Sequence, residues 1–358
     1  MSRSMRVRAF WRWIAAAMVV SLGSATSFAQ APAPGATAPP QAALEAAARY
    51  SADHGGEALL VLHDGRVIVE RYDRAGGPDR PHWLASGSKS FVGLAAVAAA
   101  QEGRLRLDDP ASEVLEEWRN DPNKARITYR QLLTMTSGLQ PGERGGALRA
   151  PAWTAMAAAP LIAPPGSRFL YGPFHLNVFA LALERKLRPE TFEAYLRRRV
   201  LDPLGVRVEW RIRCADGHPQ VASGAFMTAR DWAKVGELVR RRGEWNGRRL
   251  FEPRWIDELF RGTDANPAYG LTWWLKRPVA PALVRSVPLL RRLWGPVANA
   301  PDLPADLVAA AGAGGQRLYV VPSRRLVVVR FGDLRGEGRG FRDVEFLRLL
   351  LGPPTAHP

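Results

Sequence analysis

Two β-hairpin patterns stand near opposite ends of this chain and constrain its fold more than any other feature. In the first, residues 58–62 (ALLVL) and 67–72 (VIVERY) flank an Asp64-Gly65 pair, which is a strong hairpin signal between β-forming segments. In the second, residues 318–321 and 326–330 flank a short connection that begins with proline. Strands so far apart in the sequence share one sheet only if the intervening chain leaves it and returns.

Helix-forming patterns accompany both hairpins, at residues 41–50 before the first and at residues 341–351 after the second. The chain between the hairpins is rich in helical patterns broken by Pro/Gly loops. We therefore predict an α/β (α+β) fold, with an antiparallel sheet from both chain ends, flanking helices and an inserted helical region. The predicted single domain covers residues 41–352, with a sheet part at 41–103 and 305–352 and a helical part at 104–304.

The N-terminal segment has the pattern of a secretory signal peptide. Residues 1–12 carry arginines and no acid, residues 13–22 (WIAAAMVVSL) are mostly apolar, and Ser27-Phe28-Ala29 fits a small-x-small cleavage site. An uncleaved anchor is the alternative, but the apolar run is shorter than the roughly 18 residues that a membrane span needs. We therefore expect cleavage near Ala29, an Ala/Pro-rich linker at residues 30–40, and a periplasmic or secreted protein.

The chain is strongly basic, with 50 Lys and Arg against 34 Asp and Glu and a formal net charge of +16. Its basic runs at residues 240–242 and 248–249 come with no nucleic-acid-binding motif. We interpret them as a solvated face that attracts anionic envelope polymers weakly, and we expect no nucleic-acid partner. The single Cys214 excludes an intrachain disulfide, so the core alone must stabilise this exported protein.

The sharpest chemical signal is Ser86-Gly87-Ser88-Lys89, directly before the alanine-rich run at residues 91–100 (FVGLAAVAAA). A serine and a lysine three residues apart at a helix start lie on one helical face, within reach of each other. A neutral lysine can then take the serine proton as the serine oxygen attacks a carbonyl carbon. Burial and the helix N-terminus both favour the neutral amine.

Further segments make the chain resemble the serine β-lactamase and penicillin-binding protein superfamily, in particular its class C-related branch of esterases and 6-aminohexanoate-oligomer hydrolases. The segments that carry the resemblance are, in order, 101–110 (QEGRLRLDDP), 127–139 (ITYRQLLTMTSGL), 165–171 (PGSRFLY), 227–232 (MTARDW), 245–247 (WNG), 266–274 (NPAYGLTWW) and 314–322 (GGQRLYVVP). The resemblance spans about residues 45–350 and implies a β-lactamase/transpeptidase-like fold.

The resemblance also implies roles for individual residues. Ser86 takes the place of the acylated nucleophile, Lys89 that of its general-base partner, and Tyr171 that of the second-motif tyrosine, which shares a proton with the lysine. The backbone N–H groups of Ser86 and Ala313 take the place of the oxyanion hole, whose backbone donors do not depend on side-chain identity. No cofactor is implied.

Two departures from the family pattern bear on the substrate. Pro173 stands where the second motif usually has asparagine, so a side-chain amide is missing. The third motif, usually Lys or His, then Ser or Thr, then Gly, is Ala310-Ala311-Gly312, so a cation that would hold a substrate carboxylate is missing too. Both changes argue against efficient β-lactamase or carboxypeptidase activity.

The glycine-rich segment after the third motif supplies our candidate substrate-contacting residues. Gly312 and Gly314 would let substrate approach the strand closely, and Gln316 could hydrogen-bond a substrate carbonyl. We do not expect the neighbouring Arg317 to replace the missing cation.

Other candidates have structural interpretations. No His, Cys or carboxylate cluster has metal-ligand spacing, so we expect no metal. His82 is interpreted as a structural or surface residue, and Asp108-Asp109-Pro110 as a helix cap or turn. Trp273-Trp274 either packs in the interior or lines an apolar acyl pocket.

Three functional hypotheses follow. The first is an exported serine hydrolase that forms an acyl-enzyme at Ser86 and cleaves a small to medium ester or amide. The second is a β-lactamase or D-alanyl peptidase of the same superfamily. The third is a catalytically weak protein that binds an envelope ligand in its cleft, suggested by the two altered motifs and the basic surface. The oligomeric state stays open.

Overall fold

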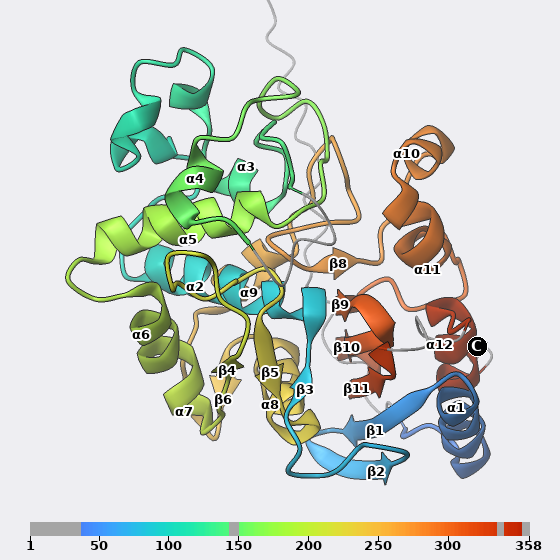
Figure 1. The fold of residues 1–358 in the computed structure, drawn as a ribbon. Coiled ribbons are helices and arrows are strands. Elements are labelled where there is room, and N and C mark those ends of the chain that lie inside the picture. The colour runs from blue at the N-terminus through green and yellow to red at the C-terminus, as the bar shows by residue number, and fades with distance from the viewer. Residues whose placement is uncertain (1–36, 143–149, 335–339, 353–358) are drawn as a thin grey trace, which may run out of the picture.

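The computed structural model describes residues 37–142, 150–334 and 340–352 (Figure 1). The predicted signal peptide and linker residues 30–36 lie outside the described residues. No helix in those three segments has the length and apolar character needed to cross a membrane.

The centre of the molecule is a six-stranded antiparallel sheet with the strand order β2-β1-β11-β10-β9-β8 (Figure 1). The bounds of its strands are β1 Gly56–His63, β2 Arg66–Tyr72, β8 Trp274–Leu275, β9 Val308–Gly312, β10 Gln316–Val321 and β11 Leu326–Gly332. Both predicted hairpins are present, β1 with β2 and β10 with β11, and β1 pairs directly with β11. The prediction of one sheet from both chain ends is therefore confirmed.

Opposite faces of the sheet are covered by different helices. The terminal helices α1 (Gln41–Asp53) and α12 (Asp343–Leu351) pack together on one face. Helix α8 (Ala229–Arg240) packs on the other, where a Cβ on Gly236 would lie 2.6 Å from the Val327 side chain. Since successive strand residues point to opposite faces, every position in β10 and β11 contacts one of these layers, and both strands are buried along their whole length.

In Figure 1 the remaining helices lie above and to the left of the six-stranded sheet, with α10 and α11 at the upper right. The helices are α2 Lys89–Gln101, α3 Tyr129–Leu133, α4 Trp153–Ala157, α5 Phe174–Leu187, α6 Phe192–Leu196, α7 Asp202–Leu204, α9 Pro253–Leu259, α10 Pro281–Ser286 and α11 Gly295–Ala298. The short strands β3 His82–Trp83, β5 Ala225–Met227 and β4 Glu209–Trp210 form one small sheet, and β6 Glu244–Trp245 pairs with β7 Arg248–Arg249.

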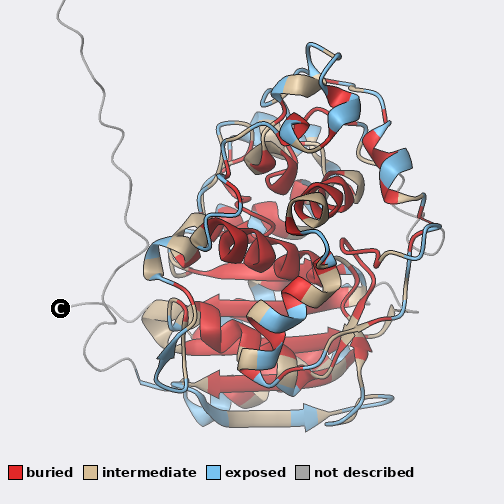
Figure 2. Ribbon diagram, turned by 90° about the vertical axis from the view of Figure 1, so that its left-hand side faces the viewer, coloured by how far each residue is buried: buried red, intermediate tan, exposed pale blue. Residues whose placement is uncertain are grey.

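The region expected to be a helical insert, residues 104–304, differs from the prediction because it also holds the strands β4 to β8. It contributes β8 and α8 to the sheet layers, because β8 pairs with β9 and α8 covers β10 and β11. The predicted boundary therefore does not separate two structural parts cleanly. Figure 2 shows the central strands and helices buried, while β2 at the sheet edge is partly exposed.

Helix α2 lies at the junction of the sheet and the helical region. Twelve of its 13 residues are buried, and five of them are alanines that let neighbouring elements approach closely. Because α2 is buried on all sides, neighbouring elements fix the position of its N-terminus. The segment from Ser86 to Lys89 lies at this N-terminus.

Candidate active site

Ser86 lies in a 3-10 turn, Ala85–Ser88, that leads directly into α2. Ala85 has a left-handed backbone conformation (φ 47°), which is rare for a residue with a side chain and is typical of functional sites. The turn is held by Ser88, whose Oγ donates to the Ala85 carbonyl (2.7 Å) and accepts from the Ala225 N–H (3.1 Å). Ser86 itself stays half-buried, so its hydroxyl remains accessible.

Lys89 contacts Ser86 as the sequence spacing predicts. Its Nζ lies 2.9 Å from Ser86 Oγ and donates a second hydrogen bond to the Ala222 carbonyl oxygen at 2.7 Å. The lysine is only 4% exposed, and within the described segments it forms no ion pair with a carboxylate. Burial lowers the pKa of Lys89 from 10.5 to about 7, so a large fraction of the amine is neutral near neutral pH.

Tyr171 is brought to the same point from the other side. The Lys89 Nζ lies 5.0 Å from the centroid of the Tyr171 ring. The ring stacks on Trp274 of β8 (5.7 Å between centroids) and meets Tyr269 edge-on (6.1 Å). Ser86, Lys89 and Tyr171, which the sequence singles out together, therefore form one cluster between α2, the start of α5 and β8.

His175 fixes the segment that carries Tyr171. Its Nε2 lies 2.6 Å from the Leu170 carbonyl oxygen and its Nδ1 lies 2.8 Å from Ser137 Oγ. Burial lowers the pKa of His175 to about 4, so the ring is neutral, donates from Nε2 and accepts the Ser137 hydroxyl proton. No sequence motif marks His175, although it lies only four residues after Tyr171.

The end of β9 lies against the turn that holds Ser86. A Cβ on Gly312 would lie 2.1 Å from the Leu84 carbonyl oxygen, so only glycine fits there. Ala313 follows and is exposed, and Gly314 and Gly315 both have left-handed backbone (φ 73° and 79°). The predicted oxyanion-hole residues, Ser86 and Ala313, thus lie on adjoining segments.

Gln316 does not take the place expected for it. Its side chain is fully buried, where Nε2 donates to the Gly332 carbonyl (2.8 Å) and Oε1 accepts from the Gly332 N–H (3.0 Å). The amide thus supplies backbone-like hydrogen bonds between β10 and β11, and its complete burial keeps it away from a substrate carbonyl. We therefore remove Gln316 from the candidate substrate-contacting residues.

The altered motif positions carry no replacement cation. Ala310 and Ala311 are buried in β9 at 2% and 3% exposure. Arg317 on the neighbouring strand β10 is turned to the opposite side, where its Nη2 donates to Asp343 Oδ2 at 3.0 Å. Pro173 stands directly before α5 and offers only its carbonyl oxygen.

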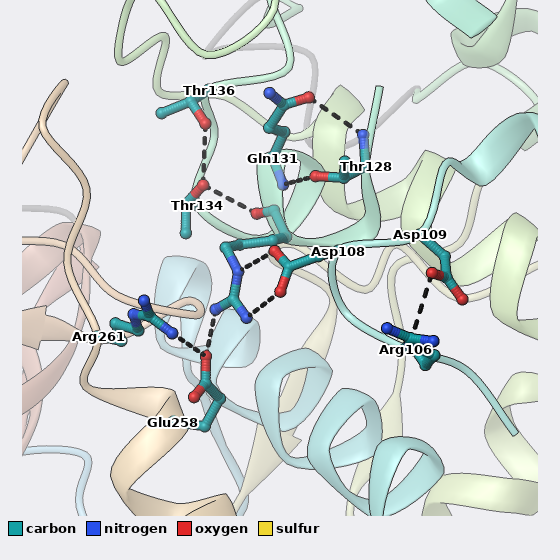
Figure 3. Close-up of polar contacts among 10 residues, drawn as sticks. Arg106, Asp108, Asp109, Thr128, Gln131, Thr134, Thr136, Glu258 and Arg261 are labelled. Atoms are coloured by element: carbon teal, nitrogen blue, oxygen red, sulfur yellow. Dashed lines mark hydrogen bonds and ion pairs between the residues drawn. The ribbon is translucent and has the colours of Figure 1, made fainter. Parts of the chain in front are cut away.

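The Asp108-Asp109 pair is structural, as expected for a turn. Arg130 on α3 donates to both Asp108 oxygens at 2.6 and 3.0 Å and also contacts Glu258 on α9 (Figure 3). Asp109 pairs with Arg106 at 3.7 Å. These contacts tie α3 and α9 together and leave the carboxylates engaged.

The other candidates are placed as follows. His82 is buried against Glu57 and stacks on Phe331, in a structural role. Cys214 is buried, and burial raises its pKa to about 12, which makes it a poor nucleophile. Trp273 and Trp274 are both buried. The described segments hold no group of three His, Cys, Asp or Glu residues able to bind a metal ion.

A cavity of about 280 Å³ adjoins Tyr171. One wall is residues 167–171, and the opposite wall comes from the α10 region, with Leu283, Val287 and Leu289. Apolar side chains on one wall and a site tyrosine on the other are typical of a small-molecule pocket. No sequence motif marks this wall.

Comparison with known proteins places this geometry in a family. Residues 42–351 match the Beta-lactamase family. A 94-residue stretch is 33% identical to Protein flp of Staphylococcus aureus, which covers 24% of this chain and only 19% of that protein. Among solved structures, the fold resembles a protein assigned as a 6-aminohexanoate-dimer hydrolase from Bacillus anthracis (TM-score 0.65, 20% identity, 84% of this chain and 78% of that one).

Two further structures share the fold. EstCE1, a hydrolase with promiscuous acyltransferase activity, matches with TM-score 0.63 and 19% identity over 86% of this chain and 97% of its own. A penicillin-binding protein homologue from Caulobacter crescentus matches with TM-score 0.64 and 17% identity over 88% and 97%. These TM-scores show a common fold.

Proposed function

The chain belongs to the beta-lactamase family, and from that premise we propose that it is an exported serine hydrolase that works through an acyl-enzyme on Ser86. The observation that carries this proposal is the 2.9 Å contact between Ser86 Oγ and the buried Nζ of Lys89. A hydroxyl beside an amine whose pKa is about 7 has a base ready to accept its proton at neutral pH.

The chemistry follows from these groups. Ser86 Oγ attacks the substrate carbonyl carbon as its proton passes to neutral Lys89, and the N–H groups of Ser86 and Ala313 stabilise the negative oxygen. When the intermediate collapses, the proton returns through Lys89 and Tyr171 to the leaving alcohol or amine. Water then attacks the acyl-enzyme, with the same groups accepting its proton and returning it to Ser86 Oγ.

The substrate class follows from what lines the site. With Ala310 in the place of a cation and Pro173 in the place of an amide, a free carboxylate or an acylamino side chain has no dedicated partner at these positions. The cavity beside Tyr171 is lined by apolar side chains together with Ser167 and Arg168, and it is large enough for a short acyl or alcohol group. We therefore favour an uncharged ester or amide of small to medium size over a β-lactam or a D-alanyl peptide.

The alternatives are weaker. A ligand-binding protein without catalysis has no need of a buried amine held against a serine hydroxyl, since burying that lysine costs stability. The remaining parts of the proposal are a periplasmic or secreted location, weak attraction to anionic envelope polymers through the basic surface, and no nucleic-acid partner.

The test uses the mature protein and its Ser86→Ala variant. Each is treated with a fluorophosphonate, its intact mass is recorded, and turnover of p-nitrophenyl esters and nitrocefin is followed on the same samples. We expect one adduct and ester turnover on the native protein, both lost in the variant, and little nitrocefin turnover. An equal adduct on both proteins, or none on the native protein, would overturn the mechanism. Nitrocefin turnover matching ester turnover would favour a β-lactamase.

A further inference from the structure

Two buried side-chain amides lie behind Lys89 and belong to no part of the mechanism above. Asn177 on α5 is fully buried, and Gln220, in the loop before β5, is 1% exposed. The two amides meet directly, because Asn177 Nδ2 donates to Gln220 Oε1 at 2.8 Å. Buried amides are costly unless they hydrogen-bond, so their partners show what they hold in place.

Their partners are the two peptide N–H groups directly before the carbonyl that binds Lys89. The Val221 N–H donates to Asn177 Oδ1 at 3.1 Å, and the Ala222 N–H donates to Gln220 Oε1 at 3.1 Å. The carbonyl oxygen of Ala222 accepts from Lys89 Nζ at 2.7 Å. The two amides thus fix the orientation of the short segment that presents this carbonyl.

The pair is anchored at the altered second motif. Besides Gln220, Asn177 Nδ2 donates to the Pro173 carbonyl oxygen at 3.1 Å. Pro173 has no side-chain amide of its own, and Asn177 lies one helical turn further along the same helix. Asn177 is therefore linked to Lys89 by a chain of hydrogen bonds that runs through Gln220 and the Ala222 peptide.

We propose that Asn177 and Gln220 are positioning residues that hold the Ala222 carbonyl against Lys89 and thereby keep its amine beside Ser86. This inference rests on the proposed function. Neither amide touches the reacting atoms, so their effect passes through the carbonyl. A shift of about 1 Å in such a group can cost about 100-fold in rate.

Few charged groups surround Lys89, so a new negative charge at position 220 should change the Lys89 pKa measurably. The titratable groups that face it in the described segments are Tyr171, whose ring lies 5.0 Å away, and neutral His175. No described carboxylate pairs with Lys89. A carboxylate at position 220 would keep both hydrogen bonds that Oε1 accepts, and Gln220 Nε2 has no partner in the described segments to lose.

The first experiment compares Gln220→Met with Gln101→Met. Gln101 is a matched control, because its amide also bridges chain segments, donating to the Leu250 carbonyl and accepting from the Glu252 N–H. It stands at the opposite end of α2 from Lys89, about 18 Å along the helix at 1.5 Å per residue. We expect kcat/KM for p-nitrophenyl esters to fall about 10- to 100-fold in Gln220→Met at every pH, and to stay within about twofold in Gln101→Met.

The second experiment uses Gln220→Glu and reads Lys89 directly. The chain has five lysines, so ε-carbon-13 lysine labelling gives five resonances, and Lys89→Met identifies the one from Lys89. We expect the Lys89 titration in Gln220→Glu to move upwards by about one pH unit, because a nearby negative charge favours the ammonium. The pH at which kcat/KM rises should increase by the same amount. At higher pH, where Lys89 is neutral in both proteins, kcat/KM of Gln220→Glu should equal the native value.

The outcomes separate this inference from the proposed function. Equal activity of Gln220→Met and Gln101→Met, with an unmoved Lys89 titration in Gln220→Glu, would overturn the positioning role even if Ser86 is the nucleophile. A moved Lys89 titration in a protein that cleaves no ester would support the coupling and refute the hydrolase proposal. A drop in Gln220→Met that Gln220→Glu does not rescue at high pH would also count against the positioning role.

Discussion

Arg317 Nη1 donates a 2.7 Å hydrogen bond to the carbonyl oxygen of Gly312. That carbonyl belongs to the same peptide group as the N–H of Ala313, the donor proposed for the oxyanion hole. In a trans peptide the C=O and N–H point in opposite directions, so an arginine that holds the carbonyl from the α12 side directs the N–H to the other side. Arg317 is held in turn by Asp343.

This arrangement predicts two separable effects of Arg317. Arg317→Met should lower kcat for esters by about 10-fold or more, because the Ala313 N–H is no longer held. It should also lower the free energy of unfolding by about 3 to 5 kcal/mol, because Asp343 is left buried without its partner. Urea unfolding and steady-state kinetics measure the two quantities.

The double variant Arg317→Met/Asp343→Asn separates them. Removing the unpaired charge should recover most of the stability, and the Tyr319 hydroxyl, which donates to Asp343 Oδ1 at 2.6 Å, keeps an acceptor. The rate should stay low. Recovery of both stability and rate would show that Arg317 serves the fold alone.

Lys89 gives the chain a pH-dependent stability that its removal should reduce. Burial lowers its pKa from 10.5 to about 7, so between these values the unfolded state holds a proton that the folded state has released. The free energy of unfolding should therefore rise with pH from about 7 to about 10. In Lys89→Met this rise should be smaller, while ester turnover falls by at least about 100-fold.

The measurement is urea unfolding of both proteins at pH 7, 8.5 and 10. Tyrosines with raised pKa values, such as Tyr269, titrate above this range and are common to both proteins. Parallel stability curves for the native protein and Lys89→Met would show that the buried amine keeps an ordinary pKa, and the proposed base would then lack its neutral form at neutral pH.

Local chemistry explains which parts of this structure the sequence predicts. The β1–β2 hairpin follows from Asp64 and Gly65, because both adopt the left-handed backbone (φ 49° and 81°) that a tight hairpin requires. The contact between Ser86 and Lys89 follows from helical spacing. Strand β8 has only two residues and pairs with β9, which lies more than 30 residues later in the chain, so no local pattern predicts it.

Contacts made by backbone groups from distant segments cannot be predicted from the sequence. The second partner of Lys89 is the carbonyl of Ala222, 133 residues away, and a carbonyl has no residue type to recognise. The role expected for Gln316 failed for a related reason, since an amide in a strand can replace backbone hydrogen bonds as readily as it binds a ligand. The motif spacing does not distinguish between these two roles of Gln316.

His175 should make the chain sensitive to mild acid. Burial lowers its pKa from 6.5 to about 4, so between these values the unfolded state binds a proton that the folded state excludes. Stability should therefore be lost as the pH falls from about 6.5 to about 4. His175→Gln should flatten this part of the stability curve, measured by thermal unfolding at several pH values. An unchanged slope in the variant would mean that other groups cause the acid sensitivity.

The wall formed by the α10 region should set the length of the group that the site accepts. Val287 lines the cavity beside Tyr171, so the indole ring in Val287→Trp should fill part of its volume of about 280 Å³. We expect turnover of p-nitrophenyl octanoate to fall by about 10-fold or more, because one or two methylenes that no longer fit cost about 1 to 3 kcal/mol in a tight apolar pocket. Turnover of p-nitrophenyl acetate should change little, since a short acyl group does not reach the wall.

Val344→Trp, a matched substitution on α12 outside the cavity lining, serves as the control. Equal losses on both esters in Val287→Trp would show that the cavity does not receive the acyl chain.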